Sequence, residues 1–162
     1  MLEGLSNNYI HSLATLLGLH KYRGVYPADK IPLGGQGSFI VNTHPANKPG
    51  EHFIVLCRLP RRYIYFDPLG LTLDNYPDVK ARVTQSKHTK KYRPYLTGPV
   101  QSPLSDFCGL FCIVFLLTID IRYKPVLTFL YPFKLHDLEK NDEICVKNVE
   151  IFSNYRRNKL GI

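Results

Sequence analysis

Three short segments of the sequence carry side chains that together could cleave an amide bond. His52 stands just before one apolar run, Asp67 just after the next, and Cys108 at the start of a third. If the first two runs pair as a hairpin, a carboxylate meets an imidazole and leaves its other nitrogen free to act as a base. A thiol that opens a helix lies among unpaired N–H groups at the positive end of the helix dipole, which favours the thiolate. These residue types predict a Cys108 nucleophile, with His52 as its base and Asp67 orienting the imidazole.

Two residues near Cys108 suit the same chemistry. Gln101, on the loop seven positions earlier, has a side-chain amide that could donate to an oxyanion alongside the backbone N–H of Cys108. Gly109 would let substrate or other backbone approach the sulfur closely. Each candidate also has a structural interpretation, because a histidine at a strand edge is commonly a surface residue and a cysteine in an apolar helix is commonly core. Their order and local settings together favour catalysis.

The position of each candidate depends on the secondary structure predicted around it. Runs rich in β-branched and aromatic residues predict three strands, at residues 39–41, 53–57 and 63–66. The short turn between the last two predicts that they form an antiparallel hairpin. Residues 22–37 are rich in glycine and proline and are predicted as a loop. Residues 84–99 are polar and basic, with a short strand near Tyr92 and Tyr95.

The periodicity of apolar residues predicts four helices. They cover residues 5–19, 71–83 with an interruption or a start at Pro77, 106–121 and 141–158. The third is apolar on all sides, so it is predicted to be a buried central helix that Cys108 enters from a loop. The first should bury Tyr9, and the last should bury Tyr155. The cap of the last is predicted to be Asn141 or Asp142.

The length and composition favour one soluble α+β domain, residues 1–162, in which helices surround a small, mostly antiparallel sheet. A hydrophobic fraction of 44% and a charged fraction of 21% exclude disorder of the whole chain. No apolar run is long enough to cross a membrane, and the first residues lack the pattern of a secretory signal. We therefore expect an intracellular monomer that is not secreted and whose cysteines stay reduced.

The cysteines and the charge bear on cofactors and partners. No metal is predicted, because the spacing of a zinc site is absent from the four cysteines, which are Cys57, Cys108, Cys112 and Cys145. Much of the net charge of +8 is clustered around residues 58–62, 80–93 and 156–159, and a surface of this sign attracts polyanions such as DNA. A basic surface that only maintains solubility explains the same pattern equally well.

Three strings carry the candidate residues in order: Glu51-His52-Phe53, Phe66-Asp67-Pro68-Leu69-Gly70, and Gln101 seven positions before Cys108-Gly109-Leu110-Phe111-Cys112. Their order and spacing resemble the motifs of the adenain family, the maturation proteases of adenoviruses. Related families are the endopeptidases of Maverick/Polinton-type elements and, more distantly, the proteases that process SUMO. The resemblance extends over about residues 22–115.

The resemblance implies a role for each site residue: nucleophile for Cys108, general base for His52, orienting acid for Asp67 and oxyanion donor for Gln101. Adenain has glutamate at the position of Asp67 and tryptophan at the position of Phe53. The resemblance also implies an adenain-like fold and viral precursor polypeptides as substrates, cut after Gly-Gly or Gly-X in a virion or a host nucleus. A string of this chain fits such a cleavage site, although a flexible loop explains it more simply: Leu33-Gly34-Gly35-Gln36-Gly37.

The cofactors of the adenain family are a disulfide-linked viral peptide and DNA. The region that matches the attachment point of the peptide, residues 87–91, has no cysteine, so disulfide-linked activation is not expected here. The basic clusters are compatible with stimulation by DNA, and no cofactor is expected to be required. Two alternatives stay open. One is a deconjugating protease that acts on SUMO or ubiquitin-like modifiers; the other is a non-catalytic basic nucleic-acid-binding domain in which the cysteine and histidine are incidental.

Overall fold

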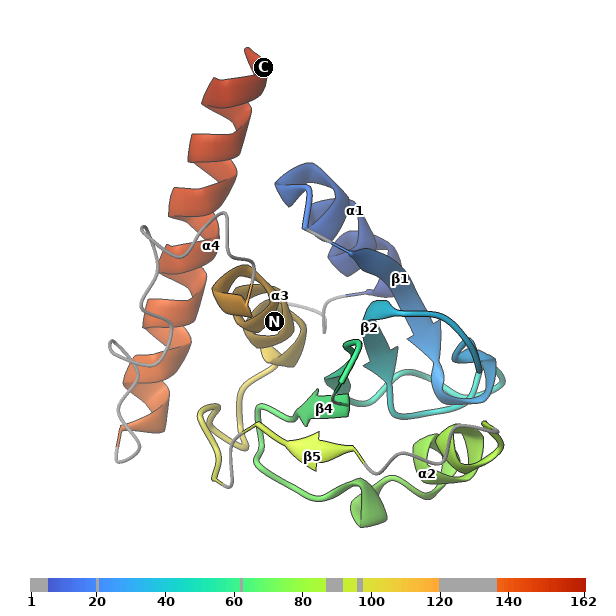
Figure 1. Cartoon of the computed structure of the whole chain (residues 1–162). Helices are drawn as coiled ribbons and strands as arrows, with labels where there is room; N and C mark the ends of the chain where they lie inside the picture. The colour runs from blue at the N-terminus through green and yellow to red at the C-terminus, as the bar shows by residue number, and fades with distance from the viewer. Residues whose placement is uncertain (1–5, 20, 62, 87–91, 96–97, 120–136) are drawn as a thin grey trace.

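The computed structural model describes residues 6–19, 21–61, 63–86, 92–95, 98–119 and 137–162. Within them, five strands form one sheet in the order β1-β2-β3-β4-β5 (Figure 1). The strands are β1 (Tyr22–Pro27), β2 (Gly37–Asn42), β3 (Phe53–Arg58), β4 (Tyr63–Phe66) and β5 (Arg93–Pro94). The helices are α1 (Asn7–Leu17), α2 (Pro77–Thr84), α3 (Cys108–Ile119) and α4 (Leu138–Leu160), with two short 3-10 turns, η1 (Ala28–Lys30) and η2 (Leu73–Asn75).

The centre of the sheet agrees with the prediction, and its edges differ. β2, β3 and β4 coincide with the three predicted strands, and the β2–β3 and β3–β4 pairs are antiparallel. Both edge strands run parallel to their neighbours, β1 to β2 and β5 to β4. The chain is therefore α+β as predicted, with a mixed sheet in place of a mostly antiparallel one.

The edge strand β1 corrects the prediction of a loop over residues 22–37. It pairs with β2 from Tyr22 to Pro27, and the register shifts between Tyr22 and Val25, around Gly24. Proline is tolerated in a strand at a sheet edge, and glycine within a strand commonly accompanies an irregularity of this kind. The composition of this segment did not indicate a strand, because glycine and proline are typical of loops.

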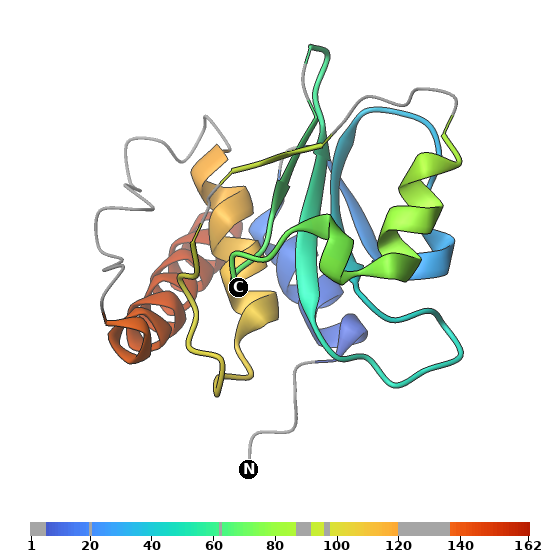
Figure 2. The same cartoon turned by 90° about the horizontal axis from the view of Figure 1, so that it is seen from below.

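The sheet separates two apolar layers, with α2 on one side and α1, α3 and α4 on the other (Figures 1 and 2). Successive residues of β3 point to opposite faces. Val55 and Cys57 pack in the layer that contains α1, α3 and α4, whereas Ile54 and Leu56 pack in the layer that contains Val79 of α2. All residues of β2 and β3 are buried, which explains their continuous apolar runs.

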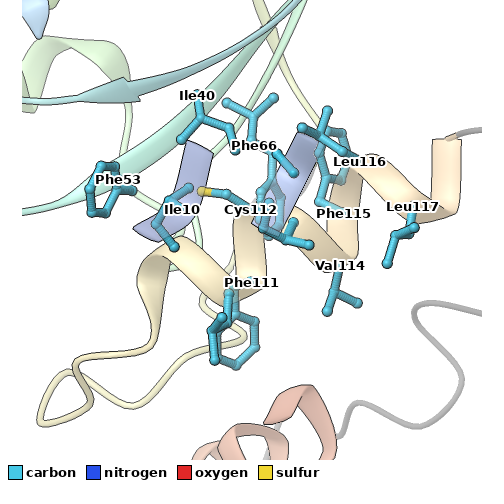
Figure 3. Packing of buried hydrophobic residues seen from close by; sticks show 14 of the residues in the cluster. Ile10, Ile40, Phe53, Phe66, Phe111, Cys112, Val114, Phe115, Leu116 and Leu117 are labelled. Carbon is cyan, nitrogen blue, oxygen red and sulfur yellow. The ribbon is translucent and has the colours of Figure 1, made fainter. Parts of the chain in front are cut away.

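The helix α3 is the buried central helix that the sequence predicts. All its residues from Cys108 to Leu117 are buried, and Figure 3 shows Phe111 and Cys112 among the apolar side chains of the core. The helix begins at Cys108, two residues later than predicted, so the cysteine lies in its first turn. Among the described helices, none combines the length and the apolar character needed to span a membrane.

The outer helices require three corrections. Tyr9 and Tyr155, which were predicted to be buried, are 51% and 48% exposed. The helix α4 begins at Leu138 with Asp137 as its cap, so Asn141 is an interior residue of the helix. The predicted helix over residues 71–83 is divided into η2 and α2, and α2 begins at Pro77, a position where the missing N–H of proline costs nothing.

Gly109 has a packing role that was not predicted from the sequence. A Cβ on Gly109 would collide with Cδ1 of Ile10, a fully buried residue of α1. We expect Gly109→Ala to lower the free energy of unfolding by about 1–3 kcal/mol, because overpacking strains the contact between α1 and α3. Urea unfolding measures this change. Gly34→Ala is the control, since its Cβ would meet nothing within 4 Å, and equal stability of the two variants would contradict the prediction.

Candidate active site

The open end of the β3–β4 hairpin brings His52 and Asp67 together. His52 directly precedes β3 and Asp67 directly follows β4, and the last paired residues of the ladder on that side are Val55 and Phe66. Nε2 of His52 lies 2.7 Å from Oδ1 of Asp67. His52 is 7% exposed and Asp67 is 3% exposed, so the pair is shielded from water. The expected proximity of these two side chains is observed.

The Asp67 carboxylate accepts hydrogen bonds from four donors. Besides the imidazole, Oδ1 accepts the backbone N–H of Leu69 at 2.9 Å. Oδ2 accepts the backbone N–H of Leu71 at 3.1 Å and the hydroxyl of Tyr76 at 2.6 Å. Gly70 lies between these two residues, and its left-handed φ of 69° lets the chain turn back so that the amide of Leu71 also reaches the carboxylate. The carboxylate therefore has a defined orientation, and it orients the imidazole in turn.

Tyr76 is a residue of the site that the sequence analysis missed. Its hydroxyl donates to Asp67, and its ring stacks against that of His52 with the centroids 5.8 Å apart and an interplanar angle of 28°. Burial, followed by the hydrogen bond to Asp67, raises the pKa of Tyr76 far above its usual value, so the hydroxyl remains a donor. The one signal in the sequence was an aromatic residue before Pro77, which is not specific.

The imidazole of His52 interacts with Cys108 as well as with Asp67. Burial is the largest single influence and lowers the pKa of His52. Hydrogen bonds with Asp67 and Cys108, together with the Coulomb attraction of both, outweigh burial and raise the pKa to about 9. The ring is therefore positively charged at neutral pH beside a thiol in the first turn of a helix.

Gln101 lies in the same cleft as His52 and Cys108. Its backbone N–H donates to the carbonyl of Pro68 at 3.1 Å, and its side-chain Nε2 donates to the carbonyl of Ser105 at 2.7 Å. An amide nitrogen has two N–H groups, so the second stays available to another acceptor. A flipped amide would place Oε1 against the Ser105 carbonyl. The structure thus places Gln101 in the wall of the cleft, and its role as an oxyanion donor stays a prediction.

A cleft of about 870 Å³ opens onto these residues. His52, Gln101 and Cys108 line it together with Tyr76, whereas Asp67 does not. The volume of the cleft is within the range of pockets that bind a small-molecule ligand. The four residues predicted from the sequence thus meet at one place, three in the wall of the cleft and one supporting His52 from outside it.

The other three cysteines are buried thiols: Cys57, Cys112 and Cys145. Burial raises the pKa of Cys112 and of Cys145 well above the usual value, which makes both poor nucleophiles. Within the described residues, no group of three histidine, cysteine or acidic side chains could hold a metal ion. Cys108 is the cysteine that lines the cleft beside His52.

No model of a known protein family matches the chain, and no curated protein matches it either. The geometry of the site and the motifs that carry its residues are therefore the features that indicate a function.

Proposed function

We propose that the chain is a cysteine endopeptidase of the adenain type. The observation that carries the proposal is the buried imidazole of His52, which bonds the Asp67 carboxylate and lines one cleft with Cys108 at the start of α3. Gln101 in the same cleft and the order of the four residues along the chain support it further.

In the proposed reaction, the Cys108 sulfur attacks the carbonyl carbon of the scissile peptide bond. The second N–H of the Gln101 amide and the backbone N–H of Cys108 stabilise the oxyanion that forms. Because Nε2 of His52 is bonded to Asp67, Nδ1 gives its proton to the leaving amine. His52 then removes a proton from water, which attacks the thioester and releases the acid product and the Cys108 thiolate.

The substrates in this proposal are viral precursor polypeptides that are cut after Gly-Gly or Gly-X, in a virus or a virus-like mobile element. The motif resemblance supports this choice. Stimulation by DNA is also proposed, and the net charge of +8 supports it. An assay with and without DNA should show stimulation that weakens as salt rises, because phosphate contacts release counterions. Rates that do not respond to DNA would remove this part of the proposal.

A panel of short peptides tests the reaction and its specificity. Peptides with Gly-Gly or Gly-X before a central bond should be cut there by the wild-type chain, whereas matched peptides with Ala-Ala should not. A ubiquitin or SUMO fusion included in the panel should be cut no faster than the peptides. Preferential cleavage of the fusions would assign the chain to the deconjugating proteases instead.

Thiol labelling separates a catalytic from a non-catalytic domain. Iodoacetamide should alkylate Cys108 at neutral pH far faster than Cys57, Cys112 or Cys145, as measured by mass spectrometry of digested protein. His52→Ala should slow the alkylation of Cys108, because it removes the imidazole that takes the proton of the thiol. Equal rates in the wild type and in His52→Ala would favour a domain in which the cysteine and histidine are incidental.

Tyr76→Phe retains the ring that stacks on His52 and removes one donor to Asp67. We expect kcat/KM for peptide cleavage to fall by about 10–100-fold, since a hydrogen bond to a charged group contributes about 1.5–3 kcal/mol. Tyr76→Leu, which also removes the ring, should lose more. Steady-state kinetics of the two variants measure both effects, and wild-type activity in Tyr76→Phe would show that the hydroxyl does not support the pair.

A further inference from the structure

The segment of residues 100–107 carries Gln101, one of the two proposed oxyanion donors, and leads into Cys108, the other, without being a helix or a strand. Its first residues are nevertheless buried: Val100, Gln101 and Ser102. On one side, the carbonyl of Pro68 accepts the backbone N–H groups of Val100 and Gln101 at 2.9 and 3.1 Å. A segment without regular structure needs such external partners to hold one conformation.

On the other side, the segment is bonded to the helix α4. Nδ2 of Asn141 donates to the carbonyl of Val100 at 2.9 Å, across 41 residues of sequence. Asn141 is 0% exposed. Asparagine is a poor residue for the interior of a helix, and burying its amide is costly unless the amide is hydrogen-bonded. The bond to Val100 supplies a partner for both groups.

Within the segment, Ser105 connects the Gln101 side chain to the residue that precedes Cys108. The carbonyl of Ser105 accepts the Gln101 amide at 2.7 Å, and its Oγ accepts the N–H of Phe107 at 3.2 Å. Internal bonds therefore extend from Gln101, the neighbour of Val100, to the residue before Cys108.

We propose that Asn141 is a positioning residue through which α4 holds residues 100–107 in the conformation that aims the Gln101 amide and the Cys108 N–H at the substrate carbonyl. This inference rests on the proposed peptidase function. Asn141 does not line the cleft, so it acts through the segment and not on the substrate. The helix α4 thereby belongs to the functional unit although it contributes no residue to the reaction.

The test uses two probes that differ in their need for an oxyanion site. Alkylation of Cys108 by iodoacetamide forms no oxyanion and depends on the thiol and His52. A peptide aldehyde adds the Cys108 sulfur to its carbonyl and forms a hemithioacetal, whose oxygen occupies the oxyanion position. Loss of an oxyanion donor costs about 10²–10³-fold in kcat, so partial misalignment should cost less.

For Asn141→Leu, we expect kcat for peptide cleavage and the affinity of the aldehyde to fall together by about 10–100-fold, with KM little changed. The alkylation rate should stay within about twofold of the wild type, since it measures only the thiolate. Asn148→Leu is the matched control, because Asn148 lies on the same helix and its buried Nδ2 has no hydrogen-bond partner within the described residues. This control should behave as the wild type.

Asn141→Ala provides a second test, because it removes the Nδ2 donor to Val100 without adding bulk at a fully buried position. It should show the same separation between cleavage and alkylation. Unchanged cleavage in both Asn141→Leu and Asn141→Ala would overturn the inference. So would a parallel loss of alkylation, which would indicate general loosening of the site. A wild-type chain without cleavage or rapid alkylation would refute the proposed function itself.

Discussion

Cys108→Ala is expected to abolish peptide cleavage, with kcat/KM at least about 10⁴-fold below that of the wild type. The reason is that the sulfur forms the covalent bond of the thioester, and no neighbouring group can take its place. Cys112, one helical turn further along α3, is fully buried and outside the cleft. Cleavage of a Gly-Gly peptide, followed by chromatography or mass spectrometry, measures the loss.

The matched control for this prediction is Cys112→Ala. It removes the same atom from the same helix, so it should cost packing energy and leave kcat/KM within a few-fold of the wild type. Thermal unfolding of both variants separates the effects, because Cys108→Ala should stay folded while inactive. Cleavage by Cys108→Ala at the wild-type rate would show that another residue is the nucleophile or that a contaminating peptidase cuts the peptide.

Asp67→Asn is expected to lower kcat/KM by about 10²–10⁴-fold, by analogy with the effect of neutralising the orienting acid of a serine protease. The carboxylate has two oxygens that accept from four donors, whereas the asparagine side chain has one oxygen. Asparagine therefore holds the His52 ring less firmly in its orientation. The variant also loses the charge that stabilises the imidazolium. The pH profile of kcat/KM reports both consequences.

The sign of the pH effect follows from the pKa of His52, which is raised from 6.5 to about 9. The imidazolium donates a proton to the leaving amine, so the alkaline limb of the wild-type profile should lie near pH 9. Asp67→Asn removes the main influence that raises this pKa, and the limb should move to lower pH. An alkaline limb that does not move would show that another group sustains the imidazolium.

The same shift predicts how stability depends on pH. A folded-state pKa above the unfolded value means that protonated His52 stabilises the fold, fully below pH 6.5 and less as pH rises through about 9. Urea unfolding of the wild type across this window should show the decline, and His52→Gln should lack that component. Parallel curves for the two proteins would contradict the assigned direction.

Local patterns of the sequence determined the part of the site that depends on a hairpin. Residues 53–57 and 63–66 are apolar runs joined by a short turn, and a short turn sets the register of the strands. The residue before one strand and the residue after the other must then be neighbours. His52 and Asp67 could therefore be paired from the sequence, and Cys108 could be placed at the start of a helix whose apolar block begins there.

Contacts between distant segments were decided only by the tertiary structure. The strand β1 exists because it pairs with β2, although Gly24 and Pro27 are typical of loops. Gly109 is required by Ile10, and Asn141 by the carbonyl of Val100. None of these requirements leaves a periodic or compositional signal, since each depends on which surface a helix or strand meets after it has formed.

The sequence by itself thus determined which residue types could do the chemistry and on which kinds of element they stand. The packing of α3, η2 and α4 around the sheet decided that Cys108 meets His52, that Tyr76 supports Asp67 and that Asn141 holds Val100. The physical reason is the range of the interactions: hairpins and helices are set by neighbours along the chain, whereas a cleft is set by the faces that those elements bury against one another.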